Sequence, residues 1–276
     1  MKGVLYIVST PIGNLEDITL RALRVLKEVD VVAAEDTRRS SKLLNHYGIS
    51  KPLTSYWGEK ERVRSEEVLR KLRDGMSVAL ISDAGTPGIS DPGGVLIERA
   101  IAEGIMVIAI PGPSAVIAAV SLSGLKVREF SFIGFLPPRK AERRKVLAEL
   151  AIERKALVFY EAPHRILEAL EDMAEILGDR NAALVKEITK IHEEVLRGSL
   201  ITIQEDLQGR TVAGEYVIVV EGKKKEEVSF GDAMNEVRSL MKRGMGRKEA
   251  VKMISEQYGF SKRELYERSL GQGNSK

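Results

Sequence analysis

The sequence contains no cysteine and only three histidines among its 276 residues. The lack of cysteine excludes a disulfide scaffold, a thiolate metal site and a cysteine nucleophile. His46, His164 and His192 lie far apart in the sequence, so we expect no metal site. No apolar stretch approaches the roughly 20 residues needed to cross a bilayer, and the apolar run at the N-terminus is too short for a secretion signal. We therefore expect a cytoplasmic protein with no membrane segment.

Composition and charge indicate a folded chain with a basic end. Hydrophobic residues make up 43% of the sequence and charged residues 30%, a balance typical of a chain with a proper core. The net charge is only +3, but residues 223–276 hold 13 Lys and Arg against 8 Asp and Glu. A basic end on a near-neutral body points to a polyanionic partner, or simply to a solvated helical face.

Apolar runs alternate with helical patterns through the first half of the chain. The predicted strands are Val4–Val8, Val31–Ala34, Val78–Ile81 and Met106–Ile110. The predicted helices are Thr19–Val29, Glu59–Asp74, Val95–Glu103 and Ser114–Ser123. This alternation predicts a mostly parallel sheet with helices on its faces.

The second half reads as a mixed sheet followed by a helical tail. Two prolines in Leu136–Arg139 break regular structure, so we place the interdomain linker there. Beyond it we predict helices at Glu142–Ala151 and Ile166–Leu177, and strands at Ala156–Tyr160, Ala183–Glu187, Glu193–Leu196 and Tyr216–Glu221, with a short helix between the last two strands. Three short helices then follow at Asp232–Arg243, Arg247–Gln257 and Lys262–Leu270. They look short of apolar residues for a core of their own.

Several loops after predicted strands carry chemistry-bearing residues. Ser9–Leu15 follows the first strand, and its glycine permits a sharp approach to a ligand or a plain turn. Ala34–Arg38 brings two carboxylates and an arginine to a strand end, where ligands bind in open α/β sheets. Alternatively, Asp36 or Thr37 caps the helix that follows.

The segment Ser82–Gly94 is the strongest indication of a site. It places four glycines and two prolines between a strand and a helix, so that backbone groups can reach a bound molecule. Pro111–Ser114 lies at a similar junction, where Ser114 can cap the next helix. Charged residues follow two later strands, in Tyr160–Arg165 and Lys186–Lys190, and we expect them to face the same cleft.

Seven segments occur in a specific order: STPIGNLEDIT, AEDTR, SDAGTPGISDPG, PGPSA, GFLPPR, FYEAPHR and EITK. In this order, from about Gly3 to Glu221, the chain closely resembles the ribosomal RNA small-subunit methyltransferase I family of the tetrapyrrole methylase superfamily. The resemblance implies an α/β fold of two domains, 1–124 and 125–222, with S-adenosylmethionine in the cleft between them. It also implies a homodimer that methylates the 2′-hydroxyl of a cytidine in the 16S rRNA of the small ribosomal subunit.

Two other functions and the role of the tail stay open. The STPIGN segment replaces the glycine-rich first loop of many tetrapyrrole enzymes, which weakens the alternative of a precorrin-type methyltransferase. A non-enzymatic rRNA-binding assembly factor is the other alternative, and the intact loop at Asp83 argues against it. Residues 229–276 resemble a helix-turn-helix module, which binds RNA or merely packs as a small bundle.

The resemblance also assigns site residues. It implies that the cofactor is bound by Pro11, Asp83, Ala84, Gly85, Thr86, Ser114, Ala115, Tyr160, Val185 and Gly214. A ribose hydroxyl is a poor nucleophile while protonated, so a general base would help, and the candidates are Asp36, Glu161 and His164. Positioning alone, with water taking the proton, is the alternative. We expect Arg38, Arg165 and Lys186 to hold backbone phosphates of the RNA.

Overall fold

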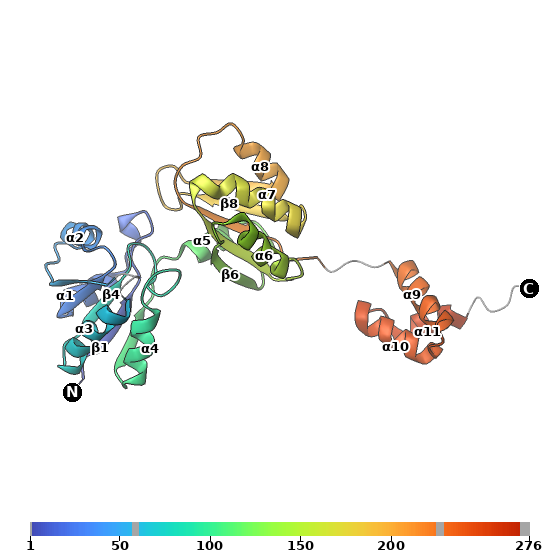
Figure 1. The fold of residues 1–276 in the computed structure, drawn as a ribbon, viewed down its shortest axis with the longest axis horizontal. Helices are drawn as coiled ribbons and strands as arrows, with labels where there is room; N and C mark the ends of the chain where they lie inside the picture. The colour runs from blue at the N-terminus through green and yellow to red at the C-terminus, as the bar shows by residue number, and fades with distance from the viewer. Residues whose placement is uncertain (1, 57–60, 225–228, 271–276) are drawn as a thin grey trace, which may run out of the picture. The chain divides into compact units, whose positions relative to one another are not determined.

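The computed structural model describes residues 2–56, 61–224 and 229–270, which group into two compact units. Met1–Lys223 is the first unit and Lys224–Lys276 the second. The first unit, called the body below, holds two five-stranded sheets (Figure 1). We call residues 2–110, which contain the first sheet, the first lobe, and residues 130–223, which contain the second sheet, the second lobe.

The first lobe is built on a parallel sheet. Its strands are β1 (Val4–Val8), β2 (Val31–Ala34), β3 (Leu53–Ser55), β4 (Val78–Ile81) and β5 (Met106–Ile110). They lie in the order β3-β2-β4-β1-β5, and every neighbouring pair is parallel, which confirms the predicted sheet. All residues of β2 and β4 are buried, as expected of central strands that helices cover on both faces.

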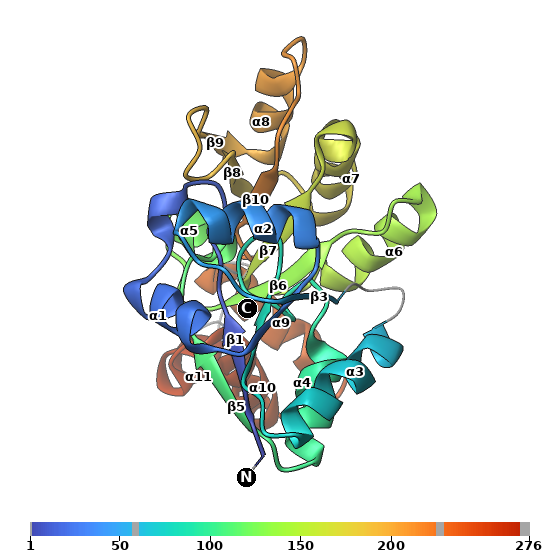
Figure 2. The ribbon, with the colours of Figure 1, turned by 90° about the vertical axis from the view of Figure 1, so that its left-hand side faces the viewer.

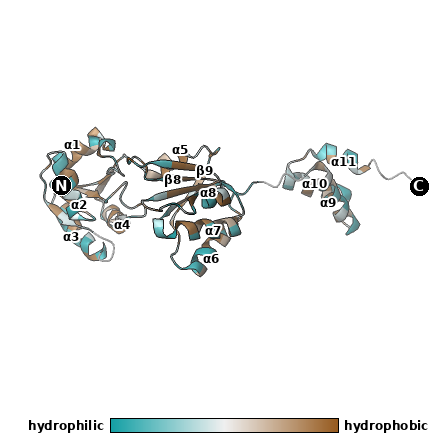
Figure 3. Ribbon diagram, turned by 90° about the horizontal axis from the view of Figure 1, so that it is seen from above, coloured by the Kyte–Doolittle hydropathy of each residue, from teal (hydrophilic) through white to brown (hydrophobic). Residues whose placement is uncertain are grey.

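Two pairs of helices cover that sheet. α1 (Leu20–Glu28) and α2 (Thr37–His46) pack their apolar residues on one face, and α3 (Glu61–Arg73) and α4 (Gly94–Ala102) on the other (Figure 2). In α3 the buried residues Val68, Leu69 and Leu72 follow the spacing of one helix face. These helices carry both hydrophobic and hydrophilic residues, as expected of helices that cover a sheet with one side (Figure 3).

The second lobe has a mixed sheet, as predicted. Its strands are β6 (Phe130–Phe135), β7 (Ala156–Glu161), β8 (Asn181–Lys186), β9 (Glu194–Ser199) and β10 (Tyr216–Val220), in the order β6-β7-β10-β8-β9. Only β6 and β7 pair in parallel. The helices α6 (Lys140–Leu150), α7 (Ile166–Leu177) and α8 (Leu200–Leu207) cover one face of this sheet.

The opposite face of the second sheet is covered by α5 (Ala115–Leu122), which follows the last strand of the first lobe. Val116 and Ala119 of this helix pack with Val158, Val217 and Val219. In β10 the side chains alternate, so Val217 and Val219 meet α5 while Ile218 joins the core on the other side. One helix therefore connects the two lobes and completes the core of the second.

The linker predicted at Leu136–Arg139 is wrong. β6, which ends at Phe135, already belongs to the second sheet, and Leu136 is 1% exposed in the core with Leu147 and Phe159. The prolines end an edge strand, a position where they are tolerated. The chain passes between the lobes earlier, through α5 and residues 123–129.

A buried ion pair joins α6 to α7 inside the second lobe. Nε of Arg143 donates to a carboxylate oxygen of Asp172 at 2.7 Å, and both side chains are 1% exposed. Arg144 donates to the other oxygen of Asp172 at 2.7 Å and also pairs with Glu175. Burial alone would raise the pKa of Asp172, but the hydrogen bonds from the two arginines outweigh it and lower that pKa.

The tail is a three-helix unit of α9 (Phe230–Lys242), α10 (Arg247–Tyr258) and α11 (Lys262–Leu270). Contrary to the sequence-based expectation, it has a core of its own, formed by Ala233, Met234, Val237, Ala250, Val251, Ile254 and Leu265. Phe230 and Phe260 pack edge to face beside it. Among the helices of the described ranges, none has the length and apolarity needed to span a membrane.

Candidate active site

The loops that follow the strands of the first sheet meet at one edge, because parallel strands end on the same side. Thr10, after β1, and Gly85, after β4, exchange backbone hydrogen bonds of 2.8 and 3.1 Å. The hydroxyls of Ser9 and Thr86 lie 2.8 Å apart and add a second link. Gly85 has a φ of +76°, which a residue with a side chain rarely adopts. The first loop and the glycine-rich loop therefore form one braced wall.

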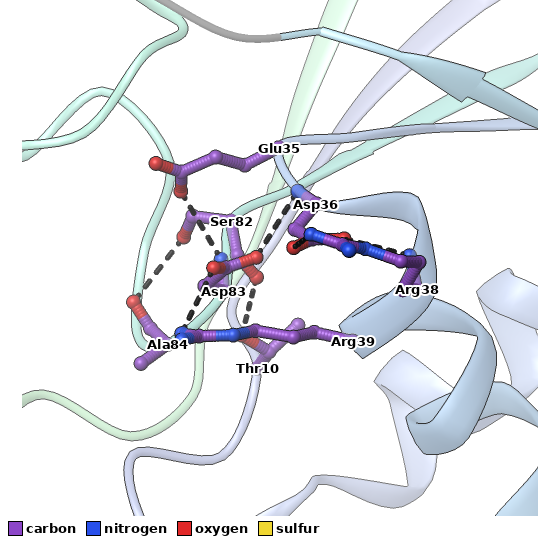
Figure 4. A network of polar contacts seen from close by, with 8 residues as sticks. All are labelled: Thr10, Glu35, Asp36, Arg38, Arg39, Ser82, Asp83 and Ala84. Atoms are coloured by element: carbon purple, nitrogen blue, oxygen red, sulfur yellow. Dashed lines mark hydrogen bonds and ion pairs between the residues drawn. The ribbon is translucent and has the colours of Figure 1, made fainter.

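Acidic residues after β2 and β4 are joined by a polar network (Figure 4). The backbone N–H of Asp36 donates to Asp83 at 3.1 Å, and the N–H of Asp83 donates to Glu35 at 3.3 Å. Arg39 of α2 pairs with the Asp83 carboxylate at 3.1 Å. Burial raises the pKa of Glu35, and the charge of Asp83 adds to this effect.

Asp36 caps the helix that follows it. Its carboxylate accepts the N–H of Arg38 at 2.8 Å and pairs with the Arg38 guanidinium at 3.1 Å, which confirms the capping interpretation. These hydrogen bonds from Arg38 lower the pKa of Asp36. The Asp36 carboxylate is thus committed to its own helix.

A cavity of about 420 Å³ lies within the body, between the two lobes. Residues 84–86 and 89–91 of the glycine-rich loop line it, together with Ser114 and Ala115 at the start of α5. The second lobe contributes residues 160–163 and 215–217, and Ile12, Phe135 and Ile188 complete the lining. Ser114 caps α5, as predicted: its hydroxyl accepts the N–H of Ile117.

The structure brings together many of the expected site residues, but not all of them. The expected residues that line the cavity are Ala84, Gly85, Thr86, Ser114, Ala115, Tyr160 and Glu161. Pro11 and Asp83 line a second, smaller cavity of about 210 Å³. The remaining expected residues, which are Asp36, Arg38, His164, Arg165, Val185, Lys186 and Gly214, do not line the main cavity.

Four of these residues that belong to the second lobe are Val185, Gly214, Lys186 and His164. Val185 is fully buried beneath α5. Gly214 has a φ of +93°, and a Cβ there would lie 2.6 Å from the Glu187 side chain. Lys186 is half-buried at the end of β8, and His164 is exposed. Because Gly214 has no side chain, the Glu187 side chain can pack against the chain just before the strand that carries Tyr216.

Arg165 follows the cavity residues 160–163 and is partly buried. Its guanidinium pairs with Glu161 at 2.5 Å and also donates to the Leu136 carbonyl oxygen at 3.2 Å. The Glu161 carboxylate, 1% exposed, in turn accepts the N–H of Ala162 at 2.8 Å. A guanidinium used this way fixes the turn after β7, and the expected phosphate contact of Arg165 stays a prediction.

Asp91 is a cavity residue that was not among the expected site residues. It is half-buried, and burial raises its pKa to about 6, with further increases from the charges of Glu35 and Asp83 and an opposing hydrogen bond from Ser82. Burial raises the pKa of the Tyr160 phenol to about 12, and the negative charge of Asp91 adds to this rise. The feature of the sequence that could have pointed to Asp91 is that it is a second aspartate within the glycine-rich segment.

The position of Asp91 is braced from α3. One carboxylate oxygen of Glu61 accepts the N–H groups of Gly93 at 2.9 Å and Val95 at 3.2 Å, and the hydroxyl of Tyr56 at 3.0 Å. Gly93 itself has a φ of +145°, and a Cβ there would lie 3.1 Å from the backbone nitrogen of Gly88. The loop that presents Asp91 is therefore closed on itself and anchored to the core.

The sequence profile of the tetrapyrrole (corrin/porphyrin) methylases matches residues 4–204. The chain is 44% identical to the ribosomal RNA small subunit methyltransferase I of Halalkalibacterium halodurans, over 96% of this chain and 94% of that protein. The chain belongs to this family. It is accordingly an enzyme, a methyltransferase, and the resemblance seen in the sequence is confirmed.

Another member of this methyltransferase family is shorter. The protein of the same name from Thermotoga maritima is 48% identical over 221 residues, which cover 80% of this chain and 99% of that protein. The Bacillus subtilis protein is 40% identical over 96% of this chain and 93% of its own length. The Thermotoga match has about the length of the body.

Solved structures confirm the fold. A uroporphyrin-III C-methyltransferase from Thermus thermophilus, in complex with S-adenosyl homocysteine, superposes with a TM-score of 0.58 at 22% identity and covers 79% of this chain and 97% of that one. A cobalt precorrin-4 methyltransferase gives a TM-score of 0.59 at 18% identity, over 79% of this chain and 94% of that one. The predicted tetrapyrrole-methylase-like α/β fold is therefore confirmed.

Proposed function

We propose that this methyltransferase transfers a methyl group from S-adenosylmethionine to the ribose 2′-hydroxyl of a cytidine in 16S rRNA. The cavity between the lobes is the observation that carries the proposal, because loops from both sheets line it in a chain that is 44% identical to a relative named as a small-subunit rRNA methyltransferase. The Thermus neighbour with bound S-adenosyl homocysteine supports the choice of cofactor.

The cavity residues fit such a cofactor. A volume of about 420 Å³ lies in the range of roughly 300–1,000 Å³ that is usual for small-molecule sites. Ile12, Ile188 and Val217 provide apolar surface, and Ser114 and the backbone of residues 84–86 provide polar groups. The Tyr216 hydroxyl, buried at the cavity, has no hydrogen-bond partner among the residues that the structure describes. When bound, the cofactor supplies an electrophilic methyl group on a sulfonium.

Residues outside the cavity lining have indirect parts in this proposal. Pro11 and Asp83 line the neighbouring smaller cavity, and they belong to the two loops that form the braced wall. Val185 and Gly214 fix the strands and the loop that carry the second-lobe lining. His164 is exposed next to the lining residue Pro163, where it can meet the RNA.

The RNA contacts are proposed for basic side chains outside the cavity. Arg38 is 89% exposed at the start of α2, and Lys186 ends β8. In the tail, Lys242, Arg243 and Lys248 are exposed around the turn between α9 and α10. Exposed or partly exposed cations of this kind bind phosphates without reading sequence.

We further propose that the enzyme acts in the cytoplasm as a homodimer. Support for the dimer comes from β5, which is the edge strand of the first sheet and leaves Met106 62% exposed. Ile101, at the end of the adjacent α4, is 61% exposed. The molar mass from light scattering tests this state directly, since a monomer has a mass of 30.5 kDa.

Methyl transfer to RNA is tested with tritium-labelled S-adenosylmethionine and small subunits from cells that lack this modification. Label is expected in the small-subunit rRNA and, after digestion, in 2′-O-methylcytidine. Fully modified subunits are the matched control and should accept no label. Label in a tetrapyrrole instead of RNA would favour the precorrin-type alternative, and binding to subunits without transfer would favour an assembly factor.

A further inference from the structure

The carboxylates at the cavity differ in whether they have a cationic partner. Glu161 pairs with Arg165 at 2.5 Å, and Glu215 pairs with Lys190 at 3.1 Å. Asp83, at the start of the glycine-rich loop that also holds Asp91, pairs with Arg39 at 3.1 Å. Asp91 lines the cavity and forms an ion pair with no residue in the described parts of the chain.

The surroundings of Asp91 hold it in place without neutralising it. Glu61 anchors the loop beyond it through Gly93, and the Gly88 N–H donates to the Pro92 carbonyl oxygen at 3.2 Å across the loop. Tyr160 faces it from the second lobe, close enough for the Asp91 charge to act on the phenol. An ionised, fixed and unpaired carboxylate in a ligand cavity is suited to receive a proton.

We propose that Asp91 is the catalytic residue that accepts the proton of the attacking ribose hydroxyl. The inference rests on the proposed function. As the bond from the hydroxyl oxygen to the methyl carbon forms, the bond from that carbon to sulfur breaks and sulfur keeps the electron pair. The hydroxyl proton passes to the Asp91 carboxylate, which returns it to water after the product leaves.

The protonation behaviour of Asp91 agrees with this role. Glu35 and Asp83 face it from the first lobe, Ser82 lies beside it, and Tyr160 faces it from the second lobe. A pKa of about 6 makes it a better proton acceptor near neutral pH than an ordinary aspartate. Below about pH 6 it becomes protonated and can no longer accept the proton, so the transfer rate should fall as the pH is lowered.

The test compares Asp91→Asn, Asp91→Glu and the exposed control Asp74→Asn in single-turnover methyl transfer from labelled S-adenosylmethionine to undermodified small subunits. Asp91→Asn is expected to lose roughly 10²–10⁴ in rate, and its residual activity should lack the acid limb seen for the wild type. Asp91→Glu should recover part of the rate and keep the limb. Cofactor affinity, measured by calorimetry, should match that of the wild type in all three variants.

Several outcomes would overturn the assignment. Asp91→Asn with wild-type rate and pH profile would remove Asp91 from proton transfer, and lost cofactor affinity would make it a binding residue. Loss of the acid limb in Asp36→Asn or Glu161→Gln, with the limb kept in Asp91→Asn, would assign the proton to one of those rivals. A wild-type enzyme that transfers no label to RNA would overturn the proposed function itself, and the Asp91 assignment with it.

Discussion

Removing the carboxylate of Asp172 is expected to destabilise the body strongly. Asp172→Asn keeps the shape of the side chain. Among the described residues it leaves the Arg143 guanidinium, 1% exposed, with only the more distant Glu168 at 3.3 Å as an anionic partner. Breaking a buried ion pair from one side costs about 3–5 kcal/mol. For a unit of this size, about 1 kcal/mol corresponds to roughly 2–4 °C, so the melting temperature should fall by about 6–20 °C.

Differential scanning calorimetry measures this shift, and the same cluster provides the control. Glu175→Gln removes a partly exposed partner of Arg144 and should cost less than about 1 kcal/mol. The double variant Arg143→Met with Asp172→Leu replaces both charges with apolar groups and should recover most of the lost stability. If Asp172→Asn lowers the melting temperature no more than Glu175→Gln, the buried pair does not stabilise the lobe as argued.

The same pair predicts a dependence on pH. Because the folded-state pKa of Asp172 is lowered, its contribution to stability is present above the unfolded value of about 3.9 and is lost as the pH falls through the lower folded value. The wild type should therefore lose stability more steeply than Asp172→Asn below about pH 4. Parallel acid-unfolding curves for the two proteins would contradict the assignment of the lowered pKa.

Two further predictions concern the cavity and the tail. Gly85→Val should abolish cofactor binding in calorimetry while the protein stays folded by circular dichroism. The reason is that a β-branched residue is strained at a φ of +76° and that its methyl groups would occupy ligand space. Unchanged cofactor affinity would remove this loop from the site. Deleting residues 229–276 should weaken binding to small subunits and flatten the salt dependence of that binding, because fewer counterions are released. Cofactor affinity should stay the same. An unchanged salt slope and an unchanged affinity for small subunits would show that the tail is not an RNA-binding element.

The regular part of the fold could be predicted from the sequence because apolar runs and helical spacing report burial directly. β1, β2, β4 and β5 have the predicted bounds. β3 was missed, since it is three half-buried residues without a distinct pattern. β6 was missed as well: the register shift between Phe132 and Gly134 interrupts its alternation. The core of the tail was underestimated because its apolar residues are spread over three helices.

The loops of the site could be predicted, but the partners of individual side chains could not. Loops after parallel strands meet at one edge in any such sheet, so the glycine-rich segment and Ser114 could be placed without coordinates. Whether Arg165 meets a phosphate or Glu161 depends on the turn after β7, and spacing does not reveal it. The same is true of Asp91, because the fold and not the sequence spacing brings Glu35 and Tyr160 near it.

The placement of α5 bears on whether the lobes can exist apart. A fragment that ends at residue 124 would carry away the helix whose Val116 and Ala119 cover the second sheet. The remaining piece would then expose Val158, Val217 and Val219 to water, and an exposed apolar patch of this kind promotes aggregation. We therefore expect the two lobes to unfold together, even though each has its own sheet. Because Ser114 begins this helix at the cavity wall, a ligand bound there touches the element on which the integrity of the second lobe depends.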